Sequence, residues 1–159
     1  MALFLRSADR RDTTVLTAIY NSNPEFLLHH LGREQVEEAF LASELEEMAR
    51  AGFSSLLITE GADGPAVAAA DVRGGEEAYL SLLILDRAAQ GRGLGRRCAA
   101  LLEDRLRSGG SRRVRIDVVD GHPGSPLPFW LRLGYTGGER VSLTWGGKTS
   151  SALVLYKEL

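Results

Sequence analysis

Cysteine is nearly absent from this chain, which carries only Cys98 among its 159 residues. No disulfide can therefore form within the chain, and a domain of this length can bury a hydrophobic core without disulfides or metal ions. Cys98 falls on the apolar side of a helical pattern, so we expect it to pack in the core as a small hydrophobic group. A reducing compartment, the cytoplasm, is the expected location.

Long hydrophobic runs are also lacking. The apolar segment at residues 2–5 ends at Arg6, which makes it too short for a signal peptide. No segment approaches the roughly 20 apolar residues that cross a membrane as a helix. Repeats, linkers and low-complexity tracts are absent too. We therefore expect one domain, residues 1–159, with no membrane partner.

The net charge is small, −2, but it is unevenly distributed. Residues 87–115 hold nine arginines and two acidic residues, a local charge of +7. Some of these arginines belong on a solvated helix face, but a basic stretch of this kind also suits a ligand with several phosphates. Nucleic acid is not expected as a partner, because the whole chain is acidic and the stretch has no aromatic residue on which bases could stack.

The middle of the chain carries the clearest pattern. An apolar strand at 78–85 leads into a glycine-rich loop at 90–95 and then into a helix with Leu94, Cys98 and Leu102 on one face. Gly109 and Gly110 end that helix. The first N–H groups of a helix have no partners within it, and glycines let a phosphate approach the backbone closely. The segment therefore predicts a phosphate-binding loop.

Two familiar phosphate loops do not match this segment. A P-loop needs a lysine before its serine or threonine, and the segment contains no lysine. A dinucleotide loop needs glycine at its first, third and sixth positions, but counting from Gly91 the sixth residue is Arg96. That loop also usually follows the first strand, whereas about half of this chain comes earlier.

Periodicity and turn residues place the other elements around this centre. A strand at 2–7 precedes a helix that has Val15, Leu16, Ile19 and Tyr20 along one face. A loop or short helix at 25–32 is followed by a helix at 33–50, whose six glutamates are expected on the outside.

The remaining pattern is mostly strand. Strands are expected at 53–60, 66–73, 113–119, 141–145 and 152–156, the last two as a hairpin around Gly146 and Gly147. A proline-rich loop at 121–128 leads into a short helix at 129–133. This order predicts a single-domain α/β fold with a mixed, mostly antiparallel sheet of six to seven strands flanked by helices.

Two motifs in this order resemble the GNAT family of N-acetyltransferases. Gln90, Gly93 and Gly95 satisfy the pattern Gln/Arg-x-x-Gly-x-Gly/Ala, the coenzyme A pyrophosphate loop that follows the fourth strand in that family. The segment FWLRLGY at 129–135 is similar to its second signature, an aromatic pair, a basic residue and then Gly-Tyr or Gly-Phe. The resemblance spans nearly the whole chain, although the first third matches only in layout.

The resemblance implies a site as well as a fold. In that family the fourth and fifth strands of the sheet splay apart. The co-substrate acetyl-coenzyme A (acetyl-CoA) lies in the opening between them, and no metal is required. Backbone pairing with the pantetheine arm is implied at Leu83 and Leu85, and aromatic contacts at Phe129 and Trp130. The implied pyrophosphate contacts are Gln90, Gly91, Arg92, Gly93, Leu94 and Gly95.

This sequence lacks two catalytic side chains that the family commonly has. Trp130 stands where a tyrosine commonly protonates the departing thiolate, and the fourth strand has Leu80 and Ser81 near the position of a glutamate base. Other residues on the N-terminal segment and on or after the fifth strand are candidates to replace the missing acid and base, although each also fits an ordinary structural role. They are Tyr20, Glu25, His29, His30, Asp117, Asp120 and His122. The catalytic residues therefore stay unassigned, and no metal-ligand spacing is present.

Three functions remain open at this point. The first is acetyl transfer from acetyl-CoA to a primary amine of a small molecule or peptide, for which the acidic remainder of the chain favours a cationic acceptor. The second is a non-catalytic acyl-CoA-binding sensor or partner module of the same fold. The third is nucleotide binding by an unrelated α/β domain. Similar proteins often dimerise, so the resemblance also leaves a homodimer open.

Overall fold

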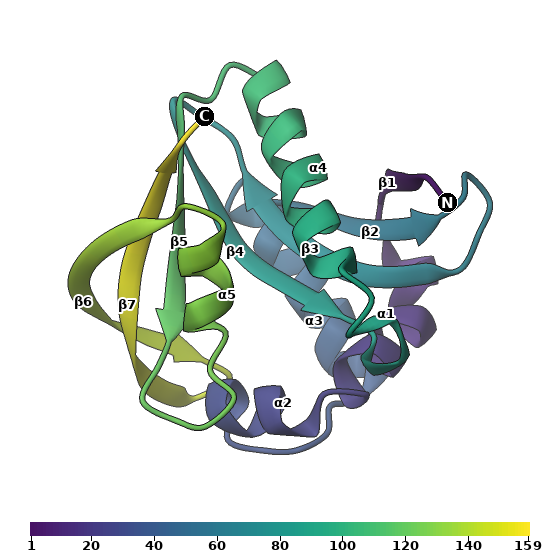
Figure 1. Cartoon of the computed structure of the whole chain (residues 1–159). Helices are drawn as coiled ribbons and strands as arrows, with labels where there is room; N and C mark the ends of the chain where they lie inside the picture. Colours follow the sequence, from purple (N-terminus) through teal and green to yellow (C-terminus); the bar gives the residue numbers. More distant parts are fainter.

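Seven strands form one sheet in the computed structural model, which describes residues 1–159 (Figure 1). In spatial order the strands are β1 (Leu3–Ser7), β2 (Ser54–Glu60), β3 (Ala66–Arg73), β4 (Glu77–Leu85), β5 (Arg113–Val119), β7 (Lys148–Glu158) and β6 (Thr136–Trp145). Only β4 and β5 pair in parallel. The predicted mixed, mostly antiparallel sheet is confirmed, with seven strands.

Helices cover both faces of this sheet. They are α1 (Thr13–Asn21), α2 (Pro24–Leu31), α3 (Glu38–Arg50), α4 (Leu94–Ser108) and α5 (Leu127–Arg132), with short 3₁₀ turns at η1 (Arg10–Asp12) and η2 (Arg87–Ala89). In Figure 1, α4 and α5 lie in front of the sheet, α1 and α3 lie behind it, and α2 lies along its lower edge. None of these helices is long and apolar enough to span a membrane.

The sheet separates two hydrophobic cores. The core on the α4 side contains Leu102 and the fully buried Cys98, so the expected packing role of this cysteine is confirmed. The core on the α1–α3 side contains Leu27 and Leu57. Strands β2, β3 and β4 contribute to both cores because alternate side chains of a strand point to opposite faces of the sheet.

A β-bulge explains why β4 and β5 separate. The two strands pair only from Glu77 to Tyr79, and β4 then departs from β5. Leu80 pairs with Val72 and Leu82 with Asp71 on β3, which leaves Ser81 between them without a partner. An extra residue bends the strand and increases its twist. The splay between the fourth and fifth strands thus begins at this bulge.

The helix predicted at 33–50 begins five residues later than expected, at Glu38. The side chain of Asn21 holds the preceding segment in a non-helical conformation: its Oδ1 accepts from the Val36 N–H at 2.8 Å and its Nδ2 donates to the Val36 carbonyl at 3.0 Å. Val36 is buried all the same. A second difference is Val15, which was expected on the apolar face of α1 but is 40% exposed.

Candidate active site

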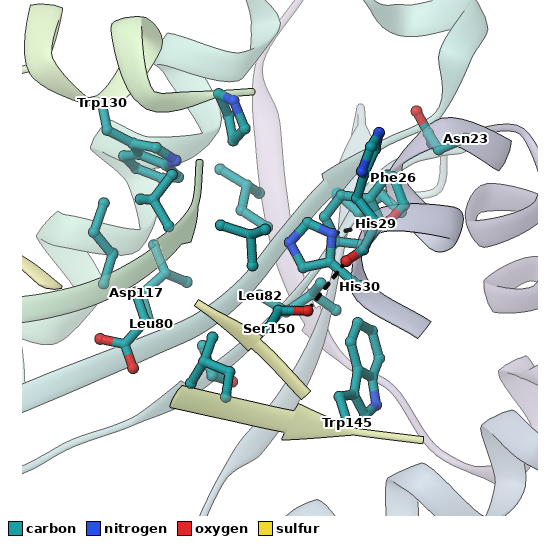
Figure 2. Close-up of a pocket in the computed structure, with 18 of the residues that line it drawn as sticks. Asn23, Phe26, His29, His30, Leu80, Leu82, Asp117, Trp130, Trp145 and Ser150 are labelled. Carbon is teal, nitrogen blue, oxygen red and sulfur yellow. Dashed lines mark hydrogen bonds between the residues drawn. The ribbon is translucent and has the colours of Figure 1, made fainter. Parts of the chain in front are cut away.

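One cavity of about 520 Å³ occupies the opening between β4 and β5 and connects the two faces of the sheet. On the α4–α5 side its walls include Gly95, Phe129 and Trp130. On the α1–α3 side they include Glu44 and Asp71. Figure 2 shows Trp130 and Trp145 at opposite sides of this space, with Leu80 and Leu82 between them. A ligand could therefore enter from one face and meet a second ligand from the other.

The unpaired part of β4 presents backbone groups to this opening. The Asp86 N–H donates to the Val67 carbonyl on β3 at 2.8 Å. Because backbone groups alternate in direction along a strand, Ile84 also faces β3, whereas Leu83 and Leu85 face the opening. The Leu85 carbonyl already accepts from the side chains of Asn23 and Gln90, at 2.7 and 3.2 Å. The N–H and carbonyl of Leu83 and the N–H of Leu85 therefore remain unpaired on the edge of β4 that faces the opening.

The glycine loop before α4 has unpaired amides. Apart from bonds within α4 itself, the backbone N–H groups of residues 91–97 donate to no acceptor in the protein, so the loop and the first turn of α4 keep their donors free for a ligand. Gly91 and Gly93 adopt φ of +78° and +75°, a region that strongly favours glycine. A Cβ at either residue would meet nothing within 4 Å. The loop therefore offers free backbone donors and open space at a helix N-terminus.

Gly95 and Gln90 of the loop motif make packing and hydrogen-bond contacts within the protein. A Cβ at Gly95 would come within 3.2 Å of the Phe129 ring, so the absence of a side chain there lets α4 pack against this aromatic residue. The Gln90 amide donates to the Asn23 Oδ1 at 2.8 Å as well as to the Leu85 carbonyl. Gln90 thus anchors the loop to the end of β4 and to α2. Leu94 is buried, so only its N–H can face a ligand.

Most arginines of the basic stretch are paired with acids. Arg92 forms a bidentate ion pair with Glu60, with nitrogen–oxygen distances of 3.1 and 2.9 Å. Other arginine pairs join residues 107 to 104, 112 to 76, 113 to 77 and 115 to 117. Near the loop, Arg87 lines the cavity and Arg96 is exposed in the first turn of α4, and neither forms an ion pair. These two are the cations best placed for phosphates.

Two carboxylates lie at the other end of the cavity. Asp71 sits opposite Ser55 on β2, whose hydroxyl donates to its Oδ1 at 2.7 Å. Glu44 of α3 accepts at 2.9 Å from the Trp145 indole N–H. Burial raises the pKa of Asp71 to about 6, and burial also raises the pKa of Glu44. Neither carboxylate takes part in an ion pair.

Sequence reasoning missed both carboxylates. Glu44 was counted among the six glutamates on the outside of the helix predicted at 33–50, but it lines the cavity. Asp71 drew no attention, although an acidic residue inside the apolar run AVAAADVR is a detectable signal because such strands rarely bury an unpaired charge. What the sequence could not provide was the packing of α3 against α1 and β2, which brings Glu44 to the cavity that Asp71 also lines.

Aromatic rings surround the carboxylates. Trp145 makes edge-to-face contacts with Tyr20, Phe26 and His30, each with ring centroids 6.4 Å apart. His30 stacks on Phe26, and burial lowers its pKa, so this ring is neutral near pH 7. Figure 2 shows Phe26, His30 and Trp145 on the same side of the cavity. This end of the cavity therefore has mostly apolar and aromatic walls, with the carboxylates of Asp71 and Glu44 set among them.

The lower edge of the cavity is closed by contacts between distant segments. The His29 ring of α2 stacks on His122 of the β5–α5 loop with centroids 3.7 Å apart. The Ser150 hydroxyl on β7 donates to the His29 carbonyl at 3.3 Å (Figure 2). The β6–β7 hairpin and α2 together form the floor of the site.

The sequence candidates for catalysis fall into different environments. Glu25 and His122 line the cavity, and Glu25 is exposed. Asp117 also lines it, but it accepts from the Tyr79 hydroxyl at 2.7 Å and forms an ion pair with Arg115 at 2.8 Å. Tyr20 is buried and does not line the main cavity, and burial raises its pKa. Asp120 is paired with Arg140 and does not line the cavity.

Asp71 should cost the protein stability above pH 6. Its pKa is higher in the folded protein than the ordinary value of 3.8, so the folded state binds this proton more tightly between about pH 4 and pH 6. Stability is thus lost as the pH rises through that window. We expect Asp71→Asn, which keeps an acceptor for Ser55, to raise the free energy of unfolding by about 2–3 kcal/mol at about pH 7.5.

Urea denaturation at two pH values measures this effect. At about pH 2.5 to 3 the aspartate is largely protonated in both states, so the wild type and the Asn variant should then differ little. An Asn variant that is less stable than the wild type at about pH 7.5 would contradict the assignment.

The chain is similar to a family of known proteins and to several solved structures. Residues 10–135 match the model of the acetyltransferase (GNAT) family. Among curated proteins, none matches the chain. An acetyltransferase from Thermus thermophilus is 25% identical with a TM-score of 0.78, covering 100% of this chain and 98% of its own.

Two further solved structures share the fold and were determined with a coenzyme. A GNAT superfamily phosphinothricin acetyltransferase from Sinorhizobium meliloti, in complex with acetyl-CoA, is 18% identical with a TM-score of 0.71 and covers 100% of this chain and 89% of its own. The paia N-acetyltransferase from Thermoplasma acidophilum, in complex with coenzyme A, is 15% identical with a TM-score of 0.69, and coverage is 100% for both chains.

Proposed function

This chain belongs to the GNAT family of acetyltransferases, and from that premise we propose that it transfers the acetyl group of acetyl-CoA to a primary amine by direct attack on the thioester. The observation that carries the proposal is the juxtaposition of two features: a loop of unpaired amides at the start of α4, and a cavity through the sheet where β4 leaves β5.

Each part of acetyl-CoA has a matching surface in this site. The pyrophosphate fits the loop at 90–95, where backbone N–H groups and the positive end of the α4 dipole favour an anion. Pantetheine fits the free edge of β4 at Leu83 and the Leu85 N–H, much as a further strand would. Phe129 and Trp130 form apolar walls beside the thioester end. Solved relatives with acetyl-CoA or coenzyme A bound support this assignment.

Transfer needs an amine that has lost its proton and a thioester carbonyl that is polarised. A β4 N–H facing the opening, such as that of Leu83, can donate to the carbonyl oxygen as negative charge develops there. Trp130 cannot protonate the departing sulfur through an O–H as a tyrosine would. The thiolate must therefore take its proton from the attacking nitrogen or from water. The amine has to approach from the α1–α3 face, because α4 and α5 cover the other face.

Thermal unfolding with acetyl-CoA tests the binding step. At about 100 times its dissociation constant the ligand should stabilise the folded state by about 2.7 kcal/mol, which raises the melting temperature by about 5–10 °C. Dephospho-coenzyme A, adenosine and pantetheine alone serve as partial ligands. If acetyl-CoA produces no shift while the protein is folded, the loop is not a coenzyme A site.

Release of free thiol across a panel of amines tests the transfer step. An acetyltransferase should release coenzyme A in proportion to acetylated amine, and mass spectrometry should detect the amide product. A sensor of the same fold would bind acetyl-CoA with the expected shift and release no thiol with any amine. The two readouts together separate an enzyme from a binding module.

A further inference from the structure

The acidic end of the cavity carries uncompensated negative charge. Asp71 has a partner only in the Ser55 hydroxyl, and Glu44 has one only in the Trp145 indole N–H. Both partners are neutral, and each carboxylate keeps one oxygen without a protein donor. Two partly buried carboxylates without a cation are costly, and many of the residues that line this end of the cavity with them are apolar or aromatic. A cationic group from outside the chain would relieve that cost.

The position of Asp71 relates this charge to the reacting bond. Asp71 pairs with Leu82 on β4, next to the unpartnered Ser81, so its Cα lies one strand spacing, about 5 Å, from the bulged segment. Asp71 shares the α1–α3 face with Leu82, whereas Gly95, Phe129 and Trp130 lie toward the other face. A nucleophile held at Asp71 would therefore face a thioester that crosses the opening at Leu83.

The walls limit what else the acceptor can carry. Phe26, His30 and Trp145 present rings, and Met48 and Leu143 add apolar surface. Arg87 is the only lysine or arginine that lines the cavity, and it lies toward the glycine loop. The lining at the acidic end therefore has no lysine or arginine to neutralise a carboxylate or phosphate on the acceptor. An anionic group beside the amine would meet two carboxylates of the same sign.

We infer that the acceptor is a primary amine with an apolar or aromatic body and no anionic group near its nitrogen, and that Asp71 binds its ammonium and accepts its proton. This inference rests on the proposed function. Glu44 supplies a second negative charge for the cation. Ser55 positions Asp71 through its hydrogen bond.

The ammonium gives one proton to the Asp71 carboxylate, and the neutral nitrogen attacks the thioester carbon. The carbon–nitrogen bond forms as the carbon–sulfur bond breaks. The sulfur takes the second proton lost from nitrogen and leaves as coenzyme A thiol, and Asp71 returns its proton to water. The products are the acetamide, the thiol and one proton.

A matched pair of amines tests the acceptor class. Phenethylamine and phenylalanine share a skeleton and differ by the carboxylate beside the amine. We expect kcat/KM for phenethylamine to exceed that for phenylalanine by about 100-fold or more, since the carboxylate must be desolvated against like charge. Equal rates for the two amines would overturn the acceptor class while leaving acetyl transfer intact. Failure of every amine, with acetyl-CoA bound, would instead overturn the proposed function.

Substitution of Asp71 tests its role in proton transfer. Asp71→Asn should lower kcat by about 100-fold or more, the range that general bases contribute, with an unchanged melting shift from acetyl-CoA. Asp63→Asn, the same chemical change in the exposed β2–β3 turn, should retain wild-type kinetics. An Asn variant at position 71 that binds acetyl-CoA and keeps kcat within threefold of the wild type would overturn the assignment.

The pH profile separates proton transfer from a merely structural role. The groups facing Asp71 are Tyr20 on α1 and Glu44 on α3, and His30 of α2 and Tyr79 of β4 line the same cavity. Wild-type kcat/KM should fall below about pH 6 as Asp71 is protonated. Glu44→Gln should retain that limb and mainly raise KM, whereas Asp71→Asn should abolish it. A limb that follows Glu44 instead would overturn the assignment to Asp71.

Discussion

Gly93→Asp should abolish coenzyme A binding. This glycine is the N-cap residue of α4, with φ of +75°, and the space where a side chain would project is open. A carboxylate there would meet the pyrophosphate at close range, and two like charges about 4 Å apart near a protein surface repel by about 4 kcal/mol. We expect the dissociation constant of acetyl-CoA to rise about 100-fold or more in isothermal titration, with complete loss of the melting shift.

Gly93→Asn is the matched control for this substitution. Asparagine has nearly the same shape and the same tolerance of the left-handed backbone region, but it carries no charge. We expect it to weaken binding by no more than about tenfold. If both variants lost binding equally, the cause would be steric. If both bound as the wild type does, the pyrophosphate would lie elsewhere.

Lys157→Met should destabilise the fold strongly. The ammonium of this β7 residue donates to Glu103 Oε1 at 3.0 Å, and the Tyr135 hydroxyl donates to Glu103 Oε2 at 2.8 Å. The Glu103 side chain is only 9% exposed. Removing the lysine leaves a buried carboxylate with one neutral donor, which costs about 3 kcal/mol. The melting temperature should fall by about 6–12 °C.

Two comparisons check the physical cause. Adding Glu103→Gln to Lys157→Met should recover much of the loss, because the amide still accepts from Tyr135 and leaves no buried charge. Arg107→Met breaks an exposed pair with Asp104 and should change the free energy of unfolding by less than about 1 kcal/mol. A Lys157 variant no less stable than the Arg107 variant would show that the buried triad contributes little.

The buried triad of Glu103, Tyr135 and Lys157 connects stability to the glycine loop at 90–95. Glu103 lies on α4, the helix whose N-terminus forms the loop, and Lys157 lies on the strand that pairs with β5. Gln90 makes the corresponding connection at the other end, through Asn23 and the Leu85 carbonyl. The loop is thus held in place by contacts outside itself, which reduces the entropy lost when a ligand binds.

Much of the fold was predictable because its signals are local. The apolar strand at 78–85, the glycines at 91 and 93 and the apolar stripe of the following helix each depend on neighbours within a few residues. The final hairpin was expected in the right place, although β6 and β7 extend beyond the predicted ranges. The start of α3 was wrong because a side chain from α1, Asn21, holds the backbone of Val36.

By itself the sequence determined the order of the elements, the glycine loop before α4 and the family, since these follow from periodicity, glycine and short motifs. Only the tertiary structure decided how the site is assembled. The bulge at Ser81 depends on strand register, and Asp71 and Glu44 line the same cavity because of how α3 packs against α1 and β2. Residues distant in sequence become a site only through packing, and a periodic pattern carries no record of which distant side chains will face one another.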